Sequence, residues 1–295
     1  MKDFLTVTGL GREEFEGLIG RASANRDLLD SRSPIEPILK GLAVANLFFE
    51  PSTRTRLSFD LAAQRLGANV ITFDPATSST SKGETLRDTA LTVQAIGADM
   101  MVVRHSTDGV PEQIASWTGL PVINAGDGMH EHPTQALLDA VTLNRRFGRL
   151  HGLRLGIVGD ILHSRVAGSL IPALRTLGIE VIAVGPADWI PESETSHADA
   201  LDDVLESLDA VYLLRVQTER GGTITKEFIA NYQLNDQRAA RLPEHAIVMH
   251  PGPMNRGVEI SEEVADSARS LITEQVRNGV PARMAVFQTL AGQTG

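Results

Sequence analysis

The chain has 295 residues, 42% hydrophobic and 22% charged, which is typical of a globular protein large enough for two domains. It contains no cysteine, which excludes disulfides, thiolate metal sites and a cysteine nucleophile and fits a reducing compartment. The formal net charge of -10, with no basic run to offset it, argues against general nucleic-acid binding. No apolar run near the start resembles a signal peptide or a membrane helix, so we expect a cytoplasmic protein that does not act at a membrane.

The first half of the sequence predicts an opening helix followed by alternating strands and helices. Apolar residues at helical spacing over Phe15–Ala22 indicate the opening helix, and the apolar run Leu42–Phe49 indicates a buried parallel strand. Further strands are expected over Asn69–Phe73, Asp99–Val103 and Pro121–Ala125, with helices over Leu57–Leu66, Leu86–Val93 and Thr134–Phe147.

A second alternating series follows the long helix that ends near Phe147. Strands are expected over Leu153–Val158, Ile179–Val184, Ala210–Leu214 and Ala246–Met249, with helices between them, the first over Val166–Leu177. This order predicts an α/β protein with two doubly wound parallel-sheet domains joined by a long helix. No strand follows the C-terminal helices, so we expect them to pack back on the first domain. The predicted domains are residues 1–140, to which the helix at about 276–295 returns, and residues 141–275.

The most informative stretch is Ser52-Thr53-Arg54-Thr55, which we call the anion turn. Pro51 ends the preceding strand, and a helical pattern begins directly afterwards, so the turn lies at the start of a helix. Such a turn presents unpaired backbone N–H groups and the positive end of a helix dipole. Hydroxyls and a guanidinium at the same place favour a phosphate site over simple helix capping.

Other polar residues also follow the ends of predicted strands. They are Arg104, His132, Gln135, Arg215, Gln217 and the run His250-Pro251-Gly252-Pro253. Each has an ordinary structural explanation when taken alone, as does Arg165 near the start of its helix. In open α/β sheets, however, ligands bind at the carboxyl ends of the strands, so the shared location predicts an active site.

Competing motifs are missing from the sequence. There is no Walker sequence, Gly156–Asp160 lacks the spacing of a dinucleotide turn, and the Gly-x-Ser-x-Gly motif of serine hydrolases is absent. His130 and His132 flank Glu131, but the two histidines lack the i, i+4 spacing of a helical metal site and no third ligand is evident. We therefore expect no metal.

At this point the residues resemble a known family. Ser52-Thr53-Arg54-Thr55-Arg56 is similar to the carbamoyl-phosphate signature of the aspartate/ornithine carbamoyltransferase family. The runs His132-Pro133-Thr134-Gln135, Arg215-Val216-Gln217 and His250-Pro251-Gly252-Pro253 match the family in the same order and span both domains. The aspartate branch is favoured by Lys82 in its polar loop, by the Arg215 segment, and by the absence of the cysteine that the ornithine branch carries.

The resemblance implies that the carbamoyl group of carbamoyl phosphate passes to the amino group of L-aspartate in pyrimidine biosynthesis, without a cofactor. It implies Arg54, Thr55, Arg104 and His132 as the catalytic residues, of which Thr55, Arg104 and His132 would stabilise the oxyanion. The implied carbamoyl-phosphate-binding residues are Ser52, Thr53, Arg54, Thr55, Ser78, Arg104, His132, Gln135, Gly252 and Pro253. The implied aspartate-binding residues are Lys82, Arg165, Arg215 and Gln217.

The resemblance also implies a homotrimer in which Lys82 completes the site of a neighbouring chain, with regulatory chains or a dihydroorotase as further possible partners. Two alternatives stay open at this stage. The chain could carbamoylate ornithine, although a cationic acceptor would need an acidic pocket in place of Arg165 and Arg215. It could also be an inactive scaffold, although every residue of the anion turn is intact.

Overall fold

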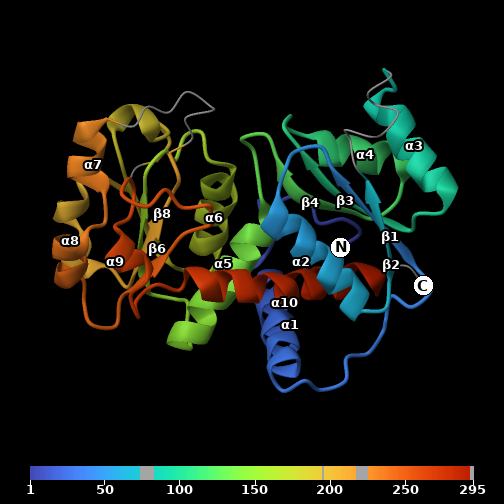
Figure 1. Ribbon diagram of the computed structural model, residues 1–295, viewed down its shortest axis with the longest axis horizontal. Coiled ribbons are helices and arrows are strands. Elements are labelled where there is room, and N and C mark those ends of the chain that lie inside the picture. Colours follow the sequence, from blue (N-terminus) through green and yellow to red (C-terminus); the bar gives the residue numbers. More distant parts are fainter. Residues whose placement is uncertain (74–82, 195, 217–224, 293–295) are drawn as a thin grey trace. The chain divides into compact units, whose positions relative to one another are not determined.

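The computed structural model describes residues 1–73, 83–194, 196–216 and 225–292. The chain divides into two compact units, the first made of Met1–Val141 with Arg277–Gly295 and the second of Thr142–Val276. Each unit contains one parallel β-sheet with helices packed against it (Figure 1). In the ranges that the structure describes, no helix is long and apolar enough to cross a membrane.

The first unit has a four-stranded parallel sheet in the order β2-β1-β3-β4. Its strands are β1 (Ala43–Phe48), β2 (Asn69–Phe73), β3 (Met100–His105) and β4 (Val122–Asp127). The helices are α1 (Arg12–Asp30), α2 (Thr53–Arg65), α3 (Leu86–Ile96), α4 (Val110–Thr118) and the first part of α5 (Pro133–Phe147). Most of α10 (Ile272–Ala291) also belongs to this unit.

Alternate residues of β1 show that both faces of this sheet are covered. Ala45 and Leu47 point into an apolar core that includes residues of α3 and α4. Between them Asn46 points to the other face, where its Nδ2 donates to Oδ1 of Asp60 in α2 at 2.5 Å. Because neighbouring residues of a strand face opposite sides, helices must lie on both faces. The predicted doubly wound arrangement is confirmed in this unit.

The helix α10 returns to the first unit, as predicted. Its Gln288 accepts a hydrogen bond from Nδ2 of Asn25 in α1 at 2.9 Å, and its Phe287 ring packs edge-on to Phe59 of α2 with centroids 5.9 Å apart. The N-terminal and C-terminal helices are therefore packed together although they are far apart in sequence.

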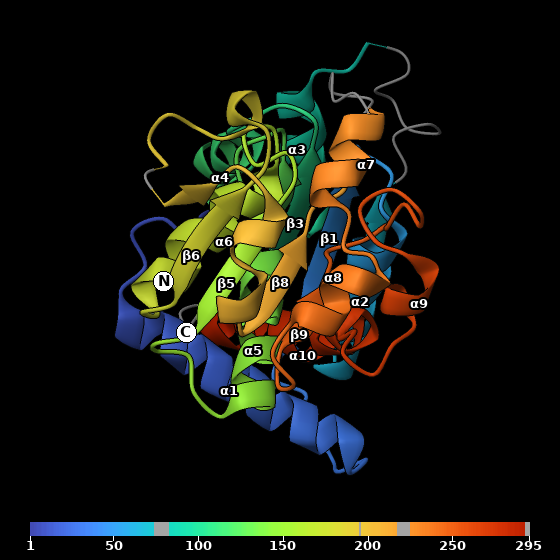
Figure 2. The ribbon, with the colours of Figure 1, turned by 90° about the vertical axis from the view of Figure 1, so that its left-hand side faces the viewer.

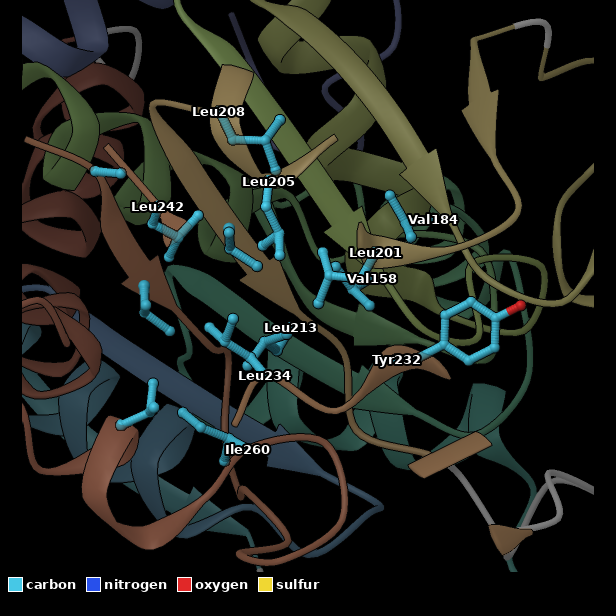
Figure 3. Close-up of a cluster of buried hydrophobic side chains, with 14 of the residues drawn as sticks. Val158, Val184, Leu201, Leu205, Leu208, Leu213, Tyr232, Leu234, Leu242 and Ile260 are labelled. Carbon is cyan, nitrogen blue, oxygen red and sulfur yellow. The ribbon is translucent and has the colours of Figure 1, made fainter. Parts of the chain in front are cut away.

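The second unit has a five-stranded parallel sheet in the order β7-β6-β5-β8-β9, whose arrows can be followed in Figure 2. Its strands are β5 (Arg154–Val158), β6 (Glu180–Val184), β7 (His197–Ala198), β8 (Ala210–Leu213) and β9 (Ile247–Met249). The helices are α6 (Arg165–Thr176), α7 (Lys226–Tyr232), α8 (Asp236–Arg241) and α9 (Glu262–Ala265). One face carries the aliphatic core drawn in Figure 3, in which Val158, Leu205 and Leu213 come from three different segments.

The structure adds features that the apolar pattern did not predict. The helix α4 and the short edge strand β7 were not expected. Leu57 and Leu61 follow the helical spacing of α2, yet their side chains are 55% and 41% exposed. The buried face of α2 is instead made of Thr55, Phe59, Ala62 and Ala63.

Candidate functional site

The anion turn connects the end of β1 to the first turn of α2. Ser52 is the N-cap residue with extended backbone (φ -160°, ψ 101°), and the first helical hydrogen bond runs from the N–H of Arg56 to the carbonyl of Ser52 at 3.2 Å. The N–H groups of residues 53–55 precede this bond, so the helix supplies no acceptors for them. Partial burial lowers the pKa of the Arg54 guanidinium, which lies on the same turn.

The N-cap of α2 differs from the N-caps of several other helices. Thr85, Ser164 and Ser261 each accept a hydrogen bond from a backbone N–H of the helix that they begin. Ser52 has the same kind of side chain, but it makes no capping hydrogen bond with the described helix. Within the described residues, the Ser52 side chain is thus not used for capping, and backbone N–H groups at a helix start are the donors that a phosphate site uses.

Arg104 lies beside the anion turn because of the register of the sheet. It pairs with Phe48 across β1 and β3, and its backbone carbonyl accepts a hydrogen bond from Phe49 N at 2.9 Å. Its side chain is held from two sides. Nε lies 3.4 Å from Oε2 of Glu50, and Nη1 donates to the carbonyl of Ala125 at 3.2 Å. The guanidinium therefore has a fixed position at the edge where β1, β3 and β4 end.

His132 and Gln135 follow the end of β4, so they reach the same edge of the sheet as Arg104. Both side chains are buried, with 5% and 8% of their surface exposed. The carbonyl of His132 accepts the backbone N–H of Gln135 at 2.9 Å, which places both residues on the first turn of α5. The strand order β1-β3-β4 thus brings Arg104 together with the anion turn, His132 and Gln135.

The loop before His132 is anchored by Glu131. The Glu131 carboxylate, 2% exposed, accepts hydrogen bonds from Val7 N at 2.8 Å, Thr8 Oγ1 at 2.9 Å and Thr6 Oγ1. On the other side, the Glu131 N–H donates to Asp127 Oδ1 at 3.2 Å. The amino-terminal segment and the end of β4 therefore hold this loop in place.

His130, the neighbouring histidine, is bonded to Asp127 through its Nδ1 at 3.1 Å. Burial lowers the pKa of His130, but the hydrogen bond and charge of Asp127, together with the charges of Glu131 and Asp108, raise it overall. No group of three His, Cys, Asp or Glu side chains is placed to hold a metal among the described residues. His130 and Glu131, both bonded to Asp127, thus help to fix the loop that carries His132.

The second unit brings cationic residues to the carboxyl ends of its own strands. Arg165 begins α6 after β5, and its side chain is only 7% exposed. Arg215 lies two residues beyond the end of β8 and is half-buried. Because β5 and β8 are neighbours in the sheet, both arginines lie at one edge of this unit, where they suit an anionic ligand.

The loop after β9, the other neighbour of β8, is fixed by the buried His250. Its Nε2 lies 3.0 Å from Oε1 of Glu259, and its Nδ1 accepts the backbone N–H of Gly252 at 2.8 Å. The carboxylate can only accept, so Nε2 carries the proton and Nδ1 is the acceptor. Gly252 adopts a positive φ of 67°, which glycine tolerates without strain. The loop presents Gly252 and Pro253 at the same edge as Arg215.

The structure thus groups the predicted site residues by unit. The first unit brings together Ser52–Thr55, Arg104, His132 and Gln135, and the second brings together Arg165, Arg215, Gly252 and Pro253. Ser78, Lys82 and Gln217 lie outside the described residues. Glu50 and Asp139, which no sequence pattern singled out, each hold a predicted site residue, Arg104 and Gln135 respectively. Asp139 lies four residues after Gln135, and that spacing on a helix was a usable signal.

Comparison with known proteins agrees with this geometry. Residues 2–145 match the carbamoyl-P binding domain of the aspartate/ornithine carbamoyltransferase family, and residues 151–290 match its Asp/Orn binding domain. The aspartate carbamoyltransferase catalytic subunit of Thermobifida fusca is 51% identical over 300 residues, which cover 99% of this chain and 96% of the relative. The catalytic subunit of Salinispora tropica is 55% identical over 267 residues, or 87% of each chain.

Among solved structures, the chain is similar to aspartate transcarbamoylases. Aspartate transcarbamoylase from Trypanosoma cruzi, in complex with aspartate and phosphate, is 33% identical with a TM-score of 0.89, covering 98% of this chain and 95% of that one. The catalytic subunit of the M. jannaschii enzyme has the same identity and TM-score and covers 100% of this chain and 99% of that one. The chain belongs to the aspartate/ornithine carbamoyltransferase family.

Proposed function

We propose that this protein is an aspartate carbamoyltransferase, which transfers the carbamoyl group of carbamoyl phosphate to the α-amino group of L-aspartate. The products are N-carbamoyl-L-aspartate and phosphate, and the reaction is a step of de novo pyrimidine biosynthesis. The observation that carries the proposal is the anion turn, where Ser52 begins α2 without capping it. The relatives named aspartate carbamoyltransferase and the solved complex with aspartate and phosphate support the same reaction.

We assign carbamoyl-phosphate binding to the first unit, residues 1–140 with the helix at about 276–295. The backbone N–H groups, hydroxyls and guanidinium of Ser52–Thr55, with Ser78, would hold the phosphate. Thr55, Arg104 and His132 would donate to the carbonyl oxygen, where negative charge develops in the transition state. From the second unit, the backbone carbonyls around Pro251 and Gly252 would join Gln135 in accepting from the carbamoyl NH2.

We assign aspartate binding to the second unit, residues 141–275. Aspartate carries two carboxylates, and Arg165 and Arg215 are suited to hold them because a guanidinium binds a carboxylate through two parallel hydrogen bonds. Gln217 and Lys82 would complete the aspartate site. A cationic acceptor such as ornithine would meet two arginines, which disfavours it.

The chemistry needs no cofactor in this proposal. The amine attacks the carbamoyl carbon, a tetrahedral intermediate forms, and it collapses with phosphate as the leaving group. The departing phosphate can accept a proton from the amine. Catalysis then depends on positioning and on donors aimed at the developing oxyanion, each worth roughly 3–4 kcal/mol. Arg104, which Glu50 and Ala125 hold in place, fits the role of a preorganised donor.

We further propose a cytoplasmic homotrimer in which Lys82 of one chain completes the site that contains Arg54 of another. A ring of this kind follows when each chain offers one surface and receives a different one. Regulatory chains or a dihydroorotase are candidate further partners, and the description of the relatives as catalytic subunits favours an assembly.

The reaction is tested by a colorimetric assay for the ureido product, with carbamoyl phosphate and a panel of amino-acid acceptors. We expect product with L-aspartate and none with ornithine. Product with ornithine alone would identify the protein as an ornithine carbamoyltransferase. No product with any acceptor would refute the proposed activity.

The aspartate site is tested by Arg215→Ala. This variant should need much more aspartate for half-maximal rate, with carbamoyl-phosphate affinity nearly unchanged, because Arg215 belongs to the second unit. An unchanged aspartate requirement would place the carboxylate site elsewhere.

The shared site is tested by refolding inactive Lys82→Ala chains together with inactive Arg54→Ala chains. Recovered activity is expected because some interfaces then join an intact Arg54 to an intact Lys82. Mixed trimers that form and stay inactive would show that the site is not shared in this way.

A further inference from the structure

The side-chain amide of Gln135 has a defined orientation because of a residue one turn further along α5. Nε2 of Gln135 lies 3.1 Å from Oδ1 and 3.2 Å from Oδ2 of Asp139. Asp139 is completely buried. An ionised carboxylate only accepts hydrogen bonds, so the nitrogen of the amide must face Asp139. The carbonyl oxygen, Oε1, must then point the other way.

Arg283 of α10 is a buried cation on which the charge of Asp139 acts. Its guanidinium is 2% exposed and lies over the ring of Phe59, with 4.8 Å between Cζ and the ring centroid. Burial lowers the pKa of Arg283 to about 9, and the charge of Asp139 acts in the opposite direction, so the guanidinium is protonated at neutral pH. A buried charge is retained when an opposite charge compensates it.

The Arg283 guanidinium is tightly packed, so that no further carbon atom fits beside it at Gly279. A Cβ added to Gly279, one turn earlier on α10, would lie 2.7 Å from Nη1 of Arg283. Phe59 belongs to α2, the helix that the anion turn begins, whereas Asp139 belongs to α5. Arg283 thus packs α10 against α2, the helix whose first turn carries the anion turn.

We propose that Asp139 is a positioning residue that turns the oxygen of the Gln135 amide toward the carbamoyl NH2. This inference rests on the proposed function, in which Gln135 meets the carbamoyl group. A carbamoyl NH2 can only donate, so it gains a hydrogen bond from Oε1 and is repelled by Nε2. Asp139, acting through Gln135, therefore selects a carbamoyl group over an acyl group of the same shape.

The test compares two stable ligands of nearly equal shape. Phosphonoacetamide carries NH2 on its carbonyl carbon, whereas (2-oxopropyl)phosphonate carries CH3 there. Calorimetry on the full-length protein should show tighter binding of the amide than of the ketone. Asp139→Asn should lower this preference roughly 3- to 10-fold, the usual range for one net hydrogen bond, while ketone binding is unchanged. The asparagine can donate its own NH2 to the Oε1 of Gln135, which allows the Gln135 amide to flip by about 180°.

A purely structural role would weaken both ligands equally, and that result would overturn the inference. A wild-type protein with no preference for the amide would also overturn it. In a Gln135→Met background Asp139→Asn should change the preference no further, because Asp139 acts through Gln135. A further fall there would show that Asp139 acts by another route.

The single substitution leaves Arg283 buried without its counter-charge and could unfold the protein. The double variant Asp139→Asn, Arg283→Met removes both charges and should keep the fold, since apolar replacement of a buried pair is often tolerated. It should show the same loss of preference. The outcome is also separable from the proposed activity: a protein that prefers the amide but forms no N-carbamoyl-aspartate supports the positioning role and refutes the reaction.

Discussion

Replacing Glu131 by alanine should both destabilise the protein and slow its reaction, because this carboxylate fixes the loop that carries His132. The substitution leaves the N–H of Val7 without its acceptor in a site where Val7 is 4% exposed. An unpaired buried N–H costs about 1–3 kcal/mol. Thr6 and Thr8 lose acceptors as well, but water can replace these in part. We therefore expect a loss of roughly 2–4 kcal/mol in the free energy of unfolding.

The effect on catalysis follows from the position of His132 next to Glu131. A displacement of about 1 Å at a reacting group lowers the rate roughly 100-fold, so kcat should fall by about 10- to 100-fold. Urea unfolding measures the stability, and steady-state kinetics at saturating substrates measure kcat. Glu131→Gln keeps one acceptor oxygen and should therefore lose less stability and less kcat than Glu131→Ala. Glu192→Ala, at an exposed loop position, is the matched control and should stay within about 0.5 kcal/mol of wild type. A Glu131→Ala protein as stable and active as this control would refute the reasoning.

Two further predictions concern stability. Gly279→Ala should lower the free energy of unfolding by about 1–3 kcal/mol, because the added Cβ would clash with the Arg283 side chain. Gly17→Ala is the control: Gly17 lies on α1 with open space around it, so alanine there should raise the free energy of unfolding by about 0.5–1 kcal/mol. Urea midpoints of the two variants that shift in the same direction would contradict this. Since Asp127 and its neighbours raise the pKa of His130 above 6.5, the folded state binds this proton more tightly. The stabilisation by this proton is complete below about pH 6.5 and is lost as pH rises through the folded-state pKa. His130→Gln should therefore weaken the pH dependence of the free energy of unfolding between about pH 5.5 and about pH 8.5. A variant with the same pH dependence as wild type would contradict this.

The βα units could be predicted from sequence because buried parallel strands are short apolar runs with clear ends. The predicted strand at Leu42–Phe49 contains β1, and Asn69–Phe73 matches β2 residue for residue. The helix α4 was missed because Gly109 and Pro111 at its start are typical of a turn. In the structure Gly109 has a positive φ of 75° and serves as the N-cap, and Pro111 occupies the first turn. A turn signal and a helix start thus coincide.

The position of the candidate site could also be predicted, since the polar residues after β1, β3 and β4 share one sheet edge. The residues that hold them could not. Glu50 pairs with Arg104 from a different strand end, and Glu131 is held by the amino-terminal segment around Thr6. Both contacts depend on which strands are neighbours, and no local pattern in the sequence records that order.

The return of α10 has a consequence for the order in which the protein matures during synthesis. The second unit is continuous in sequence, so all its residues have been made before α10 is finished. The first unit contains most of the amino-terminal half, yet its Asn25 hydrogen-bonds to Gln288 and its Phe59 ring packs against Phe287, both near the end of the chain. Closing contacts over such a separation is entropically costly and comes late. On the ribosome, the part of the chain that is made first is therefore completed last.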